Sequence, residues 1–370
     1  MRMIYLDNAA TTQVYPSAAE AAFRAMTTLY ANPASLHHFG IEAEKVLEQS
    51  RAIIAAAAGV KKEELYFTAG GTGSSNTAIF GTLASLRGGR IICSAYEHPA
   101  VLACFKQLQT KFDVVYVKPS KRGIIEPDDL FSVLTPDTRL VSIMHVNNET
   151  GAVNPIRDLA KVTKTVSKNA LFHTDAVQAF LKESFSYACV DMASFSAHKT
   201  HAPKGIGALY VKKDVSIKPV IFGGGQERGL FSGTSNVPGA AAWADAVQHT
   251  AVTQNHKTVA EVNCFCRKAI IELGAEIISP SDASVYILNA VFNGYMAENL
   301  LHALASEDIY VSTGSACSSK HGSHVFGALG MTDKQKSALR ISFSAQNTLQ
   351  EIQIFQHKLA QVLNRVAKKT

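Results

Sequence analysis

The sequence predicts an α/β protein, with a mostly parallel sheet in a large domain and a second, smaller α+β domain. Helical and strand patterns alternate through most of the first 250 residues, which favours a sheet covered by helices on both faces. The pattern changes near residue 250. The 370 residues also exceed the ~250–300 at which a single hydrophobic core usually stops growing.

The elements are expected in the following order. A helix is predicted over residues 16–31, with Pro16 in its first turn, and a second over 41–58, closed by Gly59. Short apolar runs rich in β-branched and aromatic residues predict strands at 90–93, 114–117, 140–144, 171–173, 190–195 and 207–211. Helical patterns such as 99–110 and 156–167 separate the first four of these strands. Ligands in such sheets bind at the carboxyl ends of the strands.

The domain boundaries follow from the same patterns. We place the large domain at residues 13–254 and the small domain at 1–12 together with 255–370. The first dozen residues are too short to form a unit of their own. Within the small domain, helices are expected over 258–273 and 349–366, with short strands and helices between them.

Composition excludes several classes of protein. The net charge of +6 is modest and the basic residues are scattered, so no nucleic-acid partner is expected. The longest alanine-rich stretch, 52–60, is far shorter than the ~20 apolar residues of a membrane span, and no signal-peptide pattern is present. A cytoplasmic protein without a disulfide framework is expected. Cys264 and Cys266 do not share a helix face, and no metal site is predicted.

A glycine-rich segment at residues 67–76 follows a strand-like pair and precedes a helix. Glycines let a backbone approach an anion, and a helix N-terminus offers free N–H groups. Thr72 adds a hydroxyl. The segment matches no phosphate-binding fingerprint, and a glycine-rich turn capped by serines explains it equally well.

Two residues at strand ends suit a cofactor ring. Asp175 could pair with a protonated pyridine nitrogen, and Gln178, three residues on, could hydrogen-bond a ring oxygen. His98 could stack on the ring and transfer protons. A helix N-cap is the alternative for Asp175, and a structural role is the alternative for His98.

Lys199 follows another strand end, in the run Ser196-Ala197-His198-Lys199. A buried lysine loses its charge and can form a Schiff base with an aldehyde. A solvated surface lysine is the alternative. Together with Asp175, this lysine suits an enzyme whose amine carries an aldehyde cofactor.

Two later segments could complete such a site. The glycine-rich loop 222–229 leads to Thr234 and could reach a ligand or a neighbouring subunit, although a flexible surface loop is the alternative. Cys317 lies among small residues, close to Lys320 and His321, which would favour the nucleophilic thiolate. A stray loop cysteine is the alternative. Arg340 could grip a substrate carboxylate through two hydrogen bonds.

Taken together, these segments resemble the class V branch of pyridoxal-phosphate enzymes, and within it the cysteine desulfurases of the NifS and IscS kind. The matching segments span most of the chain in family order: 5–12, 32–37, 97–101, 147–151, 173–178, 196–199, 314–318 and Arg340. The resemblance implies the pyridoxal-phosphate-dependent transferase fold, fold type I, in a homodimer.

The resemblance also implies roles for single residues. Lys199 would hold the cofactor, Asp175 would pair with its ring nitrogen, Gln178 with its ring oxygen, and His98 would stack on the ring. The residues implied to bind the phosphate are Gly71, Thr72, Ser196 and His198, with Thr234 donated by the partner subunit. Asn148 and Arg340 would orient the substrate, and Asn148 would also touch the cofactor.

The implied reaction converts L-cysteine to L-alanine. Cys317 thiolate would attack the substrate sulfur and keep it as a persulfide. That sulfur would pass to a protein acceptor in iron–sulfur cluster or thio-cofactor assembly. A selenocysteine lyase or an aminotransferase of the same fold is the alternative, but transamination needs no thiol. A partner-binding protein with a degenerate site is a further alternative.

Some positions depart from the usual family pattern. Gly73 stands where an acidic residue is common, and Leu181 where a glycine is frequent. His201-Ala202 replaces the usual Tyr-Gly pair. Phe231 stands where arginine is usual, and Ser344 where glycine is usual. None of them removes a residue of the implied chemistry.

Overall fold

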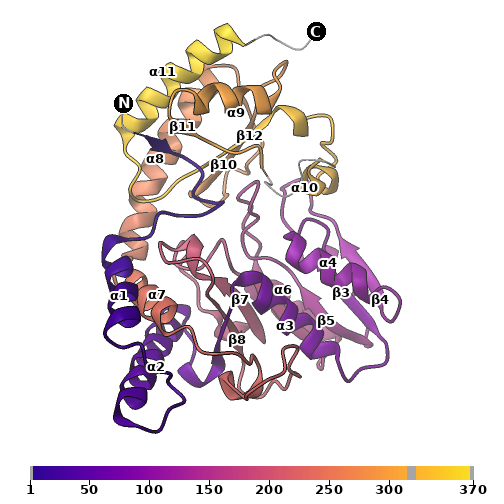
Figure 1. Ribbon diagram of the computed structural model, residues 1–370. Coiled ribbons are helices and arrows are strands. Elements are labelled where there is room, and N and C mark those ends of the chain that lie inside the picture. Colours follow the sequence, from indigo (N-terminus) through magenta and orange to yellow (C-terminus); the bar gives the residue numbers. More distant parts are fainter. Residues whose placement is uncertain (1–2, 315–321, 367–370) are drawn as a thin grey trace.

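The computed structural model describes residues 3–314 and 322–366. It contains a large sheet sandwiched between helices at one end of the molecule, and a smaller group of helices and strands at the other (Figure 1). Among the described residues, no helix is both long and apolar enough to cross a membrane.

The large sheet has seven strands in the order β2-β8-β7-β6-β5-β3-β4. Its strands are β2 (Leu65–Thr68), β3 (Arg90–Ser94), β4 (Asp113–Val117), β5 (Thr138–Ser142), β6 (Leu171–Asp175), β7 (Met192–Ser196) and β8 (Gly207–Val211). Strands β4, β3, β5, β6 and β7 are parallel neighbours, whereas β8 runs antiparallel to both β7 and β2. The prediction of a mostly parallel sheet is therefore confirmed.

Helices cover both faces of this sheet because its strands are apolar on both sides. Alternate residues of one strand enter different cores: Ile91 packs with α3 and α4, and Ile92 packs with the helices on the opposite face. The helices of the large sheet are α1 (Pro16–Thr27), α2 (His38–Ala58), α3 (Gly71–Leu83), α4 (Pro99–Leu108), α5 (Pro127–Val133), α6 (Ile156–Val166) and α7 (Val237–Gln248).

The C-terminal third builds a separate core. Helix α8 (Val252–Glu272), α9 (Ala297–Ala305) and α11 (Leu349–Arg365) pack against β10 (Ile287–Val291) and β12 (Ala338–Ser342). Strand β10 lies between β12 and β9 (Glu276–Ile277), antiparallel to both, and α10 (His324–Ala328) follows the undescribed segment. Strand β1 (Ile4–Tyr5) pairs with β11 (Ile309–Tyr310).

Some element boundaries differ from the sequence prediction. Helix α1 ends at Thr27 rather than at residue 31, because Thr27 and Thr28 are β-branched residues of low helix propensity. Gly59 does close α2, in the left-handed conformation with φ of 69°. Helix α8 begins at Val252, so the proposed domain boundary at 254/255 falls inside its first turn. The division into 13–254 and 1–12 plus 255–370 stays a prediction; the pairing of β1 with β11 supports it.

Candidate active site

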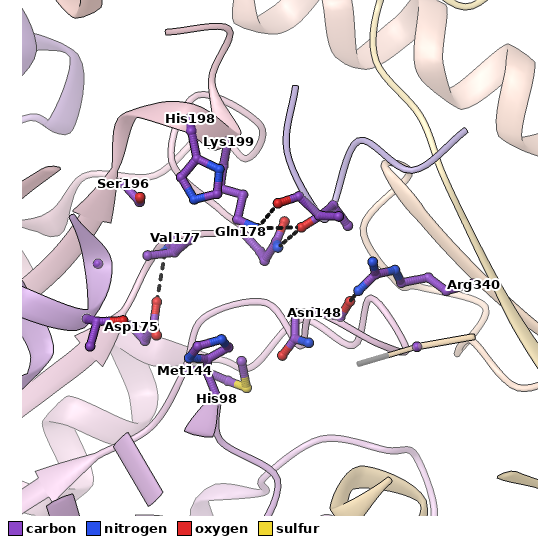
Figure 2. A pocket seen from close by; sticks show the side chains of 15 residues that line it. His98, Met144, Asn148, Asp175, Val177, Gln178, Ser196, His198, Lys199 and Arg340 are labelled. Atoms are coloured by element: carbon purple, nitrogen blue, oxygen red, sulfur yellow. Dashed lines mark hydrogen bonds between the residues drawn. The ribbon is translucent and has the colours of Figure 1, made fainter. Parts of the chain in front are cut away.

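A cavity of about 260 Å³ lies at the carboxyl ends of β6 and β7 (Figure 2). This is the edge at which parallel sheets bind ligands. Ten of the predicted site residues line it: Gly71, Thr72, His98, Asn148, Asp175, Gln178, Ser196, His198, Lys199 and Arg340. Thr234 lies in a different cavity, with Glu227 and Phe231. Cys317 lies outside the described residues.

One end of the cavity is the N-terminus of α3. The helix begins at Gly71, so the segment predicted as a loop up to residue 76 is already helical over its second half. The N-cap residue Gly70 has no side chain to accept a hydrogen bond from the first turn, which leaves N–H groups for an anion. A Cβ on Gly71 would lie 2.7 Å from Val177 Cγ2, so any larger residue here would force Val177 to move.

Asp175, at the end of β6, and His98, at the start of α4, line the same cavity. Asp175 is 5% exposed, and burial raises its carboxyl pKa, while His98 and the Val177 N–H oppose the shift. Its Oδ1 accepts a hydrogen bond from Val177 N at 3.0 Å, a turn contact rather than the helix N-cap considered as an alternative. A cation beside this buried carboxylate would be strongly favoured.

The orientation of the His98 ring is set by its position as N-cap of α4. Its Nδ1 accepts a hydrogen bond from Ala100 N at 3.1 Å, so in the neutral ring the proton is on Nε2. Burial lowers the pKa of His98, which favours that neutral form. His98 therefore combines the structural role and the cavity position that sequence reasoning had treated as alternatives.

Lys199 is anchored by the N-terminal segment of the chain. Its Nζ donates to the carbonyl oxygens of Ala9 and Ala10, at 2.7 and 2.6 Å. Gln178 Nε2 donates to the same Ala9 oxygen at 2.9 Å. Figure 2 shows both side chains reaching this segment. Lys199 is therefore not the solvated surface lysine considered as an alternative.

Arg340 lies on the side of the cavity opposite Asp175 (Figure 2). It is 3% exposed; one guanidinium nitrogen donates to Asn148 O at 2.9 Å and another to Asp7 Oδ1 at 2.9 Å. Its Nε is buried and has no hydrogen-bond partner among the described residues. A buried donor without a partner suits a ligand oxygen.

His198 and Ser196 complete the wall near α3. Burial, reinforced by the neighbouring Lys199 charge, lowers the pKa of His198 to about 4, so the ring is neutral at physiological pH. Its Nδ1 lies 3.2 Å from Thr11 Oγ1. The neutral His198 ring, the Ser196 hydroxyl and the uncapped N–H groups of α3 could bind a phosphate through hydrogen bonds and the helix dipole, without a positively charged side chain.

The residues of the cavity fit pyridoxal phosphate. The cofactor has a phosphate for the N-terminus of α3, a ring nitrogen for the buried Asp175 carboxyl, and an aldehyde for the amine of Lys199. At about 260 Å³, the cavity is slightly smaller than the ~300–1,000 Å³ typical of ligand pockets, which suits a small cofactor.

Sequence reasoning missed several residues that line or support the cavity. Ala9 and Ala10 belong to a matching segment, but nothing in the sequence indicates that their carbonyls meet a lysine 190 residues away. Val177 and Met144 also line the cavity. Lys182 donates a hydrogen bond to Gln178. The only feature of the sequence that indicates this contact is that the two residues are four positions apart.

The departures from the family pattern gather in two places. A Cβ on Gly73 would lie 3.5 Å from the Phe231 ring, so these two replacements are neighbours. Leu181, His201 and Ser344 line one small cavity beside Lys199. Leu181 and His201 both have φ of 60°, a conformation that costs a non-glycine residue about 1–2 kcal/mol.

Comparisons with known proteins agree with this geometry. The pattern of the aminotransferase class-V family matches residues 4–355. The chain is 40% identical to a NifS/IcsS protein homolog of Lactobacillus delbrueckii, over 95% of both chains. It is 36% identical to a putative cysteine desulfurase IscS 1 of Bacillus subtilis, over 99% of this chain and all of that one.

Solved structures give the same result. A NifS-like protein superposes with a TM-score of 0.94 at 37% identity, covering 99% of this chain and 100% of that one. A structure of SspA in complex with cysteine superposes with a TM-score of 0.84 at 34% identity, covering 93% and 100%. The chain thus belongs to the class-V aminotransferase family and, within it, to the NifS and IscS group.

Proposed function

We propose that this protein is a pyridoxal-phosphate-dependent cysteine desulfurase that converts L-cysteine to L-alanine. The observation that carries the proposal is the convergence of a buried carboxyl, a lysine amine and an unpartnered arginine donor in one cavity. Relatives named cysteine desulfurase and a structural neighbour solved with cysteine support the same substrate.

Each residue has a specific task in this proposal. Lys199 would hold the cofactor through Nζ, Asp175 would pair with its ring nitrogen, and Gln178 would donate to its ring oxygen. When bound, the cofactor supplies an aldehyde for the substrate amine and a cationic ring that accepts electrons. Arg340 and Asn148 would bind the substrate carboxylate, and His98 would stack on the ring and present its Nε2 proton to the reacting groups.

The sulfur would leave on Cys317. A bond forms between the Cys317 thiolate sulfur and the substrate sulfur while the substrate C–S bond breaks. Cysteine plus an enzyme thiol gives alanine plus an enzyme persulfide, so the reaction needs no external oxidant or reductant. A protein acceptor in iron–sulfur cluster or thio-cofactor assembly would then remove the sulfur, and we place this exchange in the cytoplasm.

A homodimer would complete the site through the partner subunit's Thr234. The segment that carries this threonine runs beside a surface with large exposed apolar side chains. Phe222 is 80% exposed and Ile221 41%, and Ile221 bridges to Phe231. Exposed apolar surface of this kind is typical of subunit interfaces. Sedimentation velocity tests the dimer, and a monomer at micromolar concentration would contradict it.

The function is tested by incubating purified protein with L-cysteine and measuring alanine, together with mass spectrometry of the Cys317 peptide. We expect alanine formation and a mass increase of one sulfur atom on Cys317. Cys317→Ala should keep the cofactor but lose sulfide release, while Cys264→Ala, at an exposed site on α8, serves as the matched control. Undiminished release by Cys317→Ala would refute its role, and keto-acid formation without alanine would favour an aminotransferase.

A further inference from the structure

Lys182 is a buried lysine that the proposed reaction does not use. It follows β6 in the turn that carries Gln178, and it is 6% exposed. Its Nζ donates to Gln178 Oε1 at 3.1 Å and lies 5.8 Å from the centre of the Tyr286 ring. Among the described residues it forms no ion pair with a carboxylate. An ammonium buried in this way destabilises the folded protein, so its presence calls for a role at this place.

Two other cationic side chains act on this group. Lys199 and Lys182 line the same small cavity, together with the ring of His201. Lys199 and Arg340 both lower the pKa of Lys182, whereas Glu183 raises it; burial is the largest cause, and the result is about 7. Its own charge in turn lowers the pKa of His198 and of His201.

The hydrogen bonds form a continuous path from Lys182 to Lys199. Lys182 Nζ donates to Gln178 Oε1, Gln178 Nε2 donates to Ala9 O, and Ala9 O also accepts from Lys199 Nζ. As an ammonium, the form it takes below its pKa of about 7, Lys182 can only donate, so it selects one of the two amide orientations of Gln178. The amide oxygen faces Lys182, and the NH₂ group faces Ala9 and the cavity.

This orientation decides what Gln178 offers a ligand. An NH₂ group has two hydrogens, and Ala9 O takes one of them, which leaves the second for an acceptor atom in the cavity. With the amide reversed, its oxygen would face Ala9 O and repel both that carbonyl and a cofactor oxygen. The proposed pairing of Gln178 with the ring oxygen therefore depends on this amide orientation, which Ala9 O on one side and Lys182 Nζ on the other both favour.

We propose that Lys182 is a positioning residue that holds the Gln178 amide with its NH₂ group toward the cofactor oxygen. The inference rests on the proposed function, because it concerns how this chain receives pyridoxal phosphate. Lys182 touches neither substrate nor cofactor in this scheme and acts through Gln178 alone.

A double-mutant cycle on the apo-protein tests the proposal. The variants are Lys182→Met, Gln178→Met and the double substitution, with Lys161→Met, at an exposed position on α6, as a lysine control. Pyridoxal phosphate is titrated into each variant at pH 6, where Lys182 carries its charge. Binding is followed by the fluorescence of Trp243, the single tryptophan, whose Nε1 donates to Thr200 Oγ1 at 3.0 Å, next to Lys199. The absorption maximum of the bound cofactor is recorded as a second readout.

We expect Lys182→Met to weaken binding by about tenfold, the effect of losing one charge-assisted hydrogen bond, and to shift the absorption maximum. The double variant should bind no more weakly than Gln178→Met alone, because removing the amide already removes the group on which Lys182 acts. Lys161→Met should bind like the wild type.

Three results would overturn the role of Lys182. The first is binding by Lys182→Met within twofold of the wild type. The second is a double variant in which the effects of the two single substitutions multiply. The third is an equal loss of binding in Lys161→Met. Lys182→Leu repeats the test if Lys182→Met does not fold. A wild-type protein that binds no pyridoxal phosphate would instead overturn the proposed function itself, and the inference with it.

Discussion

The buried carboxyl of Glu97 makes the stability of this protein depend on pH in a way that one substitution should abolish. Glu97 is fully buried; its Oε1 accepts hydrogen bonds from Ser94 Oγ at 2.5 Å and Met144 N at 2.7 Å. Its Oε2 has no partner among the described residues. Burial raises the pKa of Glu97 from its ordinary 4.5 to about 8.

The sign and size of the effect follow from proton linkage. Between pH 4.5 and 8 the folded state holds a proton on Glu97 that the unfolded state releases, so stability is lost as pH rises through this window. At 1.36 kcal/mol per pKa unit, the loss across the full window is about 5 kcal/mol. Glu97→Gln keeps an acceptor for Ser94 and Met144 and cannot ionise, so it should remove this loss.

The assay is urea unfolding of the apo-protein at pH 5, 6, 7 and 8, followed by Trp243 fluorescence. The free energy of unfolding of Glu97→Gln, relative to wild type, should rise by several kcal/mol from pH 5 to pH 8. An unpaired amide NH₂ group shifts the whole profile by about 1–3 kcal/mol without changing its slope. Glu63→Gln, at an exposed position, is the control. Parallel profiles for Glu97→Gln and wild type would refute the reasoning.

Three further predictions concern other buried charges. Arg51→Met removes the guanidinium that donates two hydrogen bonds to Glu227 and leaves this carboxylate buried without them. The variant should be destabilised by about 3–5 kcal/mol in chemical unfolding, and a loss below about 1 kcal/mol would contradict this. Arg340→Lys keeps a charge but loses the planar fork, and should raise KM for cysteine roughly tenfold; an unchanged KM in steady-state assays would exclude a role in binding the carboxylate. Because burial lowers the pKa of Lys182 from 10.5 to about 7, its charge destabilises the fold at pH 6, and this penalty disappears as pH rises toward 10.5. Lys182→Met apo-protein should therefore be more stable than wild type at pH 6, with the gap closing by pH 10, whereas a constant gap would contradict the prediction.

Local features of the fold and the site were predictable because they depend on residues close together in sequence. The alternation of strands and helices, the closure of α2 by Gly59 and the position of Asp175 at the end of β6 all follow from patterns a few residues long. Since the carboxyl ends of parallel strands meet at one edge, these patterns also predicted that Asp175 and Lys199 would face one cavity.

The features that only the tertiary structure decided are contacts between distant segments. The carbonyls of Ala9 and Ala10 receive the Lys199 amine, and the replacements at 181, 201 and 344 prove to be neighbours. Backbone carbonyls carry no side-chain signature, and a charge such as that of Lys182 becomes a buried charge only after the chain around it has packed. The sequence alone therefore determined which chemical groups this protein has, whereas packing determined their partners, their protonation and the direction in which each one points.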